Sequence, residues 1–154
     1  EVLRLTQSQV GYSYRAVVSY IDSHGTREVL YTSPSETIDN LDDPVQGEVT
    51  IIGEPKEGVT LRALSNSLSD EDGIASISIS WETSKDGRNW IGVNSLSGPV
   101  LSLGQSLVGS QVRARVAVVD NFGIETNLYS QATRTVENVN NKPSGRIVIR
   151  RVGQ

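Results

Sequence analysis

The sequence predicts an all-β protein, and three observations lead to this prediction. Apolar and polar residues alternate in several short segments, as they do in strands whose side chains point alternately to two faces. Turn-forming residues separate these segments at intervals of about ten residues. The 3.6-residue periodicity of an amphipathic helix is not sustained anywhere over roughly ten residues or more.

Two segments alternate most regularly. In residues 77–81, isoleucine and tryptophan alternate with serine, and in residues 112–118, valine and alanine alternate with Arg113 and Arg115, which we expect to face water. Asp86-Gly87 predicts a hairpin turn. Shorter strands are expected over residues 49–52, 59–64, 90–93, 100–103 and 127–136, which brings the number of strands close to seven.

The sequence also repeats itself with a period of 98 residues. Residues 3–56 aligned with residues 101–154 give 17 identities in 54 ungapped pairs. This period is far longer than the roughly 20–50 residues of solenoid repeats and close to the roughly 100 residues of an immunoglobulin-like sandwich. We therefore expect an immunoglobulin-like antiparallel β-sandwich repeat. The chain would comprise the C-terminal part of one repeat (1–44), a complete repeat (45–142) and the first strand of a third (143–154).

The composition argues against several classes of function. Without cysteine the chain forms no disulfide and offers no thiolate to zinc or to a substrate. The net charge of −4 without a basic stripe argues against nucleic-acid binding, and no apolar run approaches the roughly 20 residues of a membrane span. The chain contains no methionine, even at position 1, so we expect it to have been processed or cut from a longer protein.

Histidine and tryptophan give little support for catalysis. The only histidine, His24, lies in a predicted turn, and Phe122 takes its place in the complete repeat, so we do not expect an enzyme. Trp81 is expected in the core of the sandwich. Trp90, close to the Asp86-Gly87 turn, is the better candidate for stacking on a sugar, although a ligand role is not the favoured interpretation of it either.

Acidic residues collect in predicted loops. Asp39, Asn40, Asp42 and Asp43 precede Pro44, Asp70 and Asp72 lie together before Gly73, and Asp22 and Asp120 occupy equivalent turns of the two repeats. Calcium prefers six to eight hard oxygen ligands, which such loops supply. The alternative is that these residues serve turns, because Asp and Asn side chains bond to their own backbone there.

Several of these segments resemble a known family when they are taken in order. They are Gly47-Glu48-Val49-Thr50-Ile51, Glu57-Gly58-Val59-Thr60-Leu61, Leu68-Ser69-Asp70-Glu71-Asp72-Gly73, Ile79-Ser80-Trp81 and Val136-Glu137-Asn138-Val139-Asn140-Asn141. Their order and spacing are similar to the tandem immunoglobulin-like and cadherin-like repeats of very large bacterial surface or secreted proteins, including RTX-type adhesins.

The resemblance implies an extracellular spacer or adhesive module on the bacterial surface. Its partners would be neighbouring repeats and a cell-surface or matrix ligand, and calcium would stiffen the junctions between repeats. The resemblance points to Asp39, Asn40, Asp42 and Asp43 at the first junction and to Asp70 and Asp72 in the acidic loop, and Asp120 in its turn is a further candidate ligand. At the second junction it points to Glu137, Asn138, Asn140 and Asn141, and weaker binding is expected because Asn141 replaces an aspartate beside Lys142. The alternative is a sandwich that itself binds a carbohydrate or a protein ligand.

Overall fold

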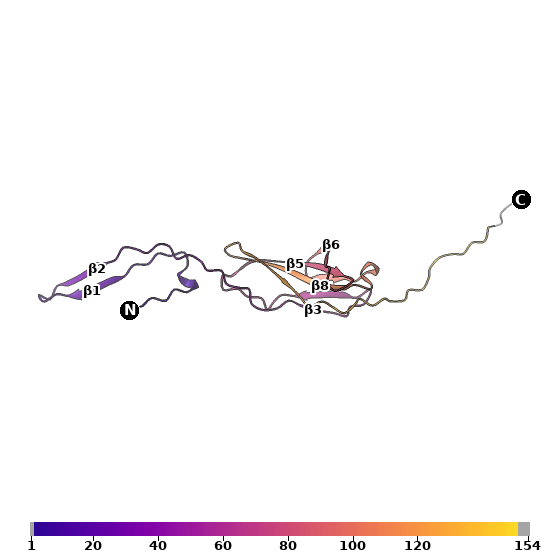
Figure 1. Ribbon diagram of the computed structural model, residues 1–154, viewed down its shortest axis with the longest axis horizontal. Coiled ribbons are helices and arrows are strands. Elements are labelled where there is room, and N and C mark those ends of the chain that lie inside the picture. The colour runs from indigo at the N-terminus through magenta and orange to yellow at the C-terminus, as the bar shows by residue number, and fades with distance from the viewer. Residues whose placement is uncertain (1, 151–154) are drawn as a thin grey trace.

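The computed structural model describes residues 2–150, apart from the side chains of residues 94–96. Position 1 of the predicted partial repeat 1–44 and positions 151–154 of the predicted segment 143–154 lie outside the described residues. Figure 1 shows an elongated molecule, with a hairpin at one end, a two-sheet unit in the middle and an extended C-terminal segment at the other end.

Strands make up the regular structure of the described chain, which confirms the all-β prediction. In chain order the elements are η1 (Gln7–Gln9), β1 (Val17–Ile21), β2 (Arg27–Tyr31), β3 (Thr50–Ile52), β4 (Thr60–Leu64), β5 (Ile74–Ser84), β6 (Ile91–Ser97), β7 (Val100–Ser102), η2 (Gln105–Leu107), β8 (Gln111–Asp120) and β9 (Glu125–Tyr129). The two helical elements are single 3-10 turns. In the part of the chain that the structure describes, no helix is long and apolar enough to span a bilayer.

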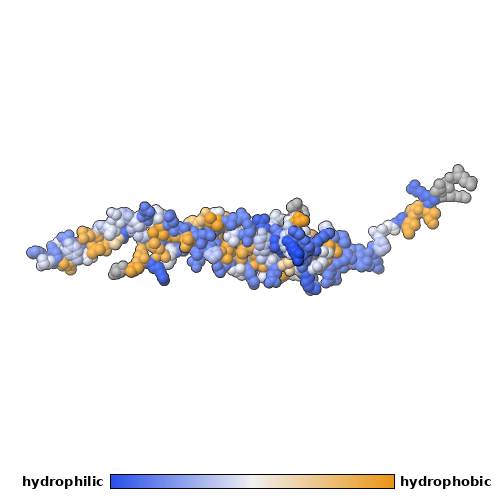
Figure 2. All heavy atoms as spheres, in the orientation of Figure 1, coloured by the Kyte–Doolittle hydropathy of each residue, from blue (hydrophilic) through white to orange (hydrophobic). Residues whose placement is uncertain are grey.

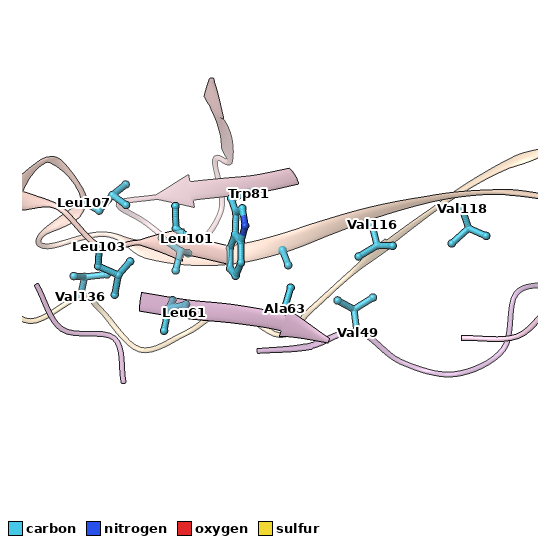
Figure 3. Close-up of a cluster of buried hydrophobic side chains, with 12 residues drawn as sticks. Val49, Leu61, Ala63, Trp81, Leu101, Leu103, Leu107, Val116, Val118 and Val136 are labelled. Atoms are coloured by element: carbon cyan, nitrogen blue, oxygen red, sulfur yellow. The ribbon is translucent and has the colours of Figure 1, made fainter. Parts of the chain in front are cut away.

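Two antiparallel sheets, in the orders β3-β4-β7 and β6-β5-β8-β9, enclose the hydrophobic core. Along β8 every second residue is buried, as the alternation in the sequence predicts. Trp81 of β5 is 1% exposed and lies among the aliphatic side chains of both sheets (Figure 3). Its indole Nε1 donates a 3.0 Å hydrogen bond to the carbonyl of Gly98, so its one polar atom is satisfied. The expected core role of Trp81 is confirmed.

Strand β9 ends at Tyr129, earlier than the predicted boundary at residue 136. Beyond it, hydroxyl groups replace backbone carbonyls as acceptors. Ser130 Oγ accepts a hydrogen bond from the Ala114 N–H at 2.9 Å, and Thr133 Oγ1 accepts one from the Val112 N–H at 3.1 Å. The segment therefore follows β8 without forming a regular ladder. Residues 143–150, the described part of the segment 143–154 expected to supply the first strand of a third repeat, contain no strand.

The hairpin β1–β2 reproduces the hairpin β8–β9 at the 98-residue spacing. Val17 lies opposite Tyr31 as Arg115 lies opposite Tyr129, and the register continues unchanged to the turn. The turns also agree, since Asp22 Oδ1 accepts the N–H groups of His24 and Thr26 just as Asp120 Oδ1 accepts the N–H groups two and four residues further on. The sequence duplication therefore has a counterpart in backbone geometry.

The loop between β5 and β6 is organised by Asp86. Its carboxylate accepts hydrogen bonds from the backbone N–H groups of Asn89 and Arg88, from the Asn89 amide and from the Ser84 hydroxyl. These bonds favour the ionised form, and the backbone N–H of Asn89 contributes most to lowering the pKa of Asp86 below its ordinary value of 3.8. The predicted Asp86-Gly87 turn is thus stabilised by a charge.

Replacing Asp86 by asparagine is expected to destabilise the protein at neutral pH. Because the pKa is lower in the folded state, this stabilisation is fully present above the unfolded value of 3.8 and is lost as pH falls towards the folded value. Urea unfolding of wild type and Asp86→Asn should therefore differ most at pH 7, and the difference should shrink from about pH 4 downwards. A difference that stayed constant down to about pH 2.5 would contradict this role of the charge.

Candidate metal centre

Three aspartates from distant parts of the sequence meet at the end of the two-sheet unit that faces the hairpin. Asp42 lies in the linker between the hairpin and β3, Asp72 lies in the loop before β5, and Asp120 is the last residue of β8. One carboxylate oxygen from each lies within 4.8 Å of the other two. The topology creates this cluster, because β5 and β8 are antiparallel neighbours and the start of one lies beside the end of the other.

Hydrogen bonds from backbone N–H groups hold each buried carboxylate in place. Asp120 Oδ1 accepts the N–H groups of Phe122 and Ile124 at 2.9 and 2.7 Å. Asp72 is held by its own N–H, which donates to Asp70 Oδ1 at 2.9 Å, while its Oδ2 accepts the N–H of Asp43 at 3.0 Å. One oxygen of each buried side chain thus serves the fold.

The other oxygens of these two side chains have no protein partner. Asp72 and Asp120 are each only 4% exposed, and Asp72 Oδ1 and Asp120 Oδ2 are buried without a hydrogen-bond partner among the described residues. Burying an unpaired carboxylate oxygen is costly, and two of them close together repel each other as well. The arrangement therefore calls for a positive charge between them.

Asp42 closes the cluster from the solvent side. It is exposed, yet partial desolvation, followed by the negative charges of Asp120 and Asp72, raises the pKa of Asp42 above its ordinary value. A bound cation would remove this repulsion. The donors are hard oxygens, with no cysteine in the chain and its only histidine in another turn, which suits calcium with ligands at about 2.3–2.6 Å and water completing the shell.

The structure brings together only some of the residues that the sequence suggested as ligands. Asp42, Asp72 and Asp120 form the cluster, and Asp70 and Asp43 support it through the bonds to Asp72. Asn40 is engaged elsewhere, because its Oδ1 accepts a 3.0 Å hydrogen bond from Gln7 Nε2 of the N-terminal piece. Asp39 lies outside the group of three carboxylates.

The suggested sugar platform at Trp90 is partly occupied by the protein itself. The guanidinium of Arg113 lies 4.3 Å from the centre of the Trp90 ring and 4.3 Å from that of Tyr129. Glu82 completes the group with a 2.7 Å ion pair to Arg113, whose side chain is 24% exposed. One face of the half-buried Trp90 is thus covered, and Arg113, expected to face water, lies between two rings.

At the opposite end of the two-sheet unit, the linker that leaves it is attached through Glu57. The carboxylate accepts the Val139 N–H at 3.0 Å and the Asn141 amide at 3.5 Å, while the backbone of Glu137 bonds to both Pro55 and Glu57. Asn141, a suggested second-junction ligand, is therefore engaged with Glu57. Glu57 had no predicted role beyond its place in a family-like segment, because its partners lie more than 80 residues away in the sequence and leave no local signal.

Comparison of the chain with known proteins found no matching family model, no matching curated protein and no matching solved structure.

Proposed function

We propose that this chain is an extracellular repeat module of a large bacterial surface or secreted protein, and that Asp42, Asp72 and Asp120 bind calcium where two repeats meet. The observation that carries the metal site is that Asp72 and Asp120, each 4% exposed, both bury a carboxylate oxygen without a hydrogen-bond partner and both belong to a cluster of three carboxylates with Asp42. Turn formation alone does not account for these buried oxygens, because the other oxygen of Asp120 already serves its turn and the other oxygen of Asp72 already accepts the N–H of Asp43 from the linker.

The junction supports a stiffening role for the ion. On one side of the linker, Asn40 is bonded to Gln7, and on the other side the Asp43 N–H is bonded to Asp72. Between these two anchors lie Leu41 and Asp42. A cation held by Asp42 and the two buried carboxylates would fix this short stretch of the linker between its two anchors.

The fold fits this proposal. Seven antiparallel strands in the described residues 50–129 form sheets of three and four around one core, and this number of strands supports the proposed immunoglobulin-like sandwich. The 98-residue period supports the proposal that residues 45–142 are one repeat of a series. The first partners of this repeat would be its neighbouring repeats, and the assembled protein would bind a cell-surface or matrix ligand. A spacer of this kind requires no catalytic machinery.

Thermal unfolding across a calcium titration tests the metal site. An ion that binds only the folded state adds RT ln(1 + [L]/Kd), about 2.7 kcal/mol at a hundredfold excess over Kd, so Tm should rise by roughly 10 °C relative to EDTA. Magnesium at the same concentration should give a smaller rise, because it gives up its water shell reluctantly. An unchanged Tm in millimolar calcium would refute the site.

The duplication provides a matched control. Asp120→Asn and Asp22→Asn change the same residue in the same turn geometry, but only Asp120 lies beside Asp42 and Asp72. Asp120→Asn should abolish the rise in Tm with calcium, whereas Asp22→Asn should leave it intact. Equal responses of the two variants would mean that calcium acts elsewhere on the protein.

A further inference from the structure

The β1–β2 hairpin exposes a face that its duplicate buries. Val18 and Tyr20 are 54% and 50% exposed, whereas Val116 and Val118, at the same positions of the duplicate, are 0% and 1% exposed. Figure 2 shows apolar residues gathered along this end of the molecule. In the sheet order of the larger unit, β8 has β5 on one side and β9 on the other, while β1 pairs with β2 alone among the described residues 2–150. The edge of β1 that corresponds to the β5 side is therefore open.

The hairpin is already in the conformation of the complete sheet. Hydroxyl acceptors beyond β2 repeat those beyond β9, since Ala16 N–H donates to Thr32 Oγ1 and Tyr14 N–H donates to Ser35 Oγ, each at 3.0 Å. The corresponding bonds of Ala114 and Val112 measure 2.9 and 3.1 Å. The open edge is thus preorganised, so adding a strand would require little further ordering of the hairpin.

Arg15 indicates what that strand must carry. Its guanidinium lies 4.4 Å from the centre of the Tyr31 ring, as Arg113 lies 4.3 Å from that of Tyr129. Arg113 also pairs with Glu82, which lies directly opposite it on β5. Within the described residues, Arg15 forms no ion pair with any carboxylate. One half of the charged pair is present and the other half is missing.

We infer that the edge of β1 binds an antiparallel strand of the β5 type, with apolar residues alternating with small polar ones and a carboxylate opposite Arg15. In β5 the register places Ile77, Ile79 and Glu82 opposite Val118, Val116 and Arg113. Shifted by the 98-residue period, the same residues would meet Tyr20, Val18 and Arg15. The natural occupant is the corresponding strand of the repeat to which residues 1–44 belong. This binding requires no metal.

A labelled peptide with the sequence of residues 74–84 tests the inference on the full chain in EDTA. Fluorescence anisotropy should show saturable binding, and hydrogen exchange should show new protection of amides in Val17–Ile21. Arg15→Glu should weaken binding by about tenfold or more, and a peptide carrying Glu82→Lys should restore it to that variant. Arg27→Glu, which makes the same charge change on β2, is the control and should bind the unmodified peptide normally.

Three results would overturn the inference. They are the absence of saturable binding, protection elsewhere than Val17–Ile21, and equal effects of Arg15→Glu and Arg27→Glu. Sedimentation of the chain without peptide tests whether a second copy of the chain occupies this face instead. A dimer that Val18→Glu dissociates and the peptide does not would assign the face to a second copy of the chain and would equally exclude the proposed strand.

Discussion

Replacing Trp81 by alanine is expected to lower the free energy of unfolding of the two-sheet unit by about 3–5 kcal/mol. The indole is 1% exposed, contacts aliphatic side chains of both sheets and gives its N–H to the Gly98 carbonyl. Its removal leaves a cavity between the sheets and an acceptor without its partner. Since domains of this size are stable by only about 5–15 kcal/mol, a large part of the stability would be lost.

The second tryptophan is the control for this measurement. Trp90 is half-buried and stacks on Arg113 outside the core, so Trp90→Ala should cost about 1 kcal/mol, most of it the cation–π contact. Urea unfolding monitored by far-UV circular dichroism measures the loss of stability in both variants, because this signal reports the sheets and requires neither tryptophan. Equal losses for the two variants would contradict the assignment of the core.

Replacing Asp42 by asparagine is expected to have opposite effects with and without calcium. In EDTA the variant should be more stable than wild type, because partial desolvation and the negative charges of Asp120 and Asp72, which raise the pKa of Asp42, disfavour its charged form in the folded state. That penalty is fully present above the raised pKa and is relieved as pH falls through it. In excess calcium the order should reverse, because the site has lost one of three anionic ligands and its affinity should fall by about tenfold or more.

Asp43→Asn is the neighbouring control. It removes the same charge one residue further along, but the Asp43 side chain lies outside the group of three carboxylates, and its backbone N–H still binds Asp72. Isothermal titration with calcium, and melting curves in EDTA, should show a clear crossover for Asp42→Asn and small effects for Asp43→Asn. A variant at position 42 that was less stable than wild type in both conditions would rule out repulsion within an ion-binding cluster.

Alternation in the sequence predicted the buried side of β8 and the central position of Trp81, because both depend on neighbours close in the chain. The acidic loops were also recognised, but not their convergence. Asp72 and Asp120 meet because β5 and β8 pair, and the bond from the Asp43 N–H to Asp72 brings the linker residue Asp42 beside them. Composition could not separate Asp39 and Asn40 from these ligands, since a shared loop does not determine which way each side chain turns.

Long-range contacts escaped prediction for the same reason. The Glu57 carboxylate accepts hydrogen bonds from Val139 and Asn141 across most of the repeat, and no sequence pattern near these residues predicts the contact. The hydroxyl groups of Ser130 and Thr133 ended β9 early by accepting bonds that a regular ladder would give to carbonyls. Such substitutions depend on a single side chain in the right place, which periodicity does not encode.

The attachment of the outgoing linker has a mechanical consequence. The chain enters the two-sheet unit at one end and leaves it at the other, so tension on the polypeptide acts along the long axis of the molecule (Figure 1). The linker runs parallel to the segment around Lys56, joined to it by the backbone bonds of Glu137 and by Glu57. Pulling would load these bonds together in shear instead of opening them one at a time, so the exit of the unit resists extension as a block.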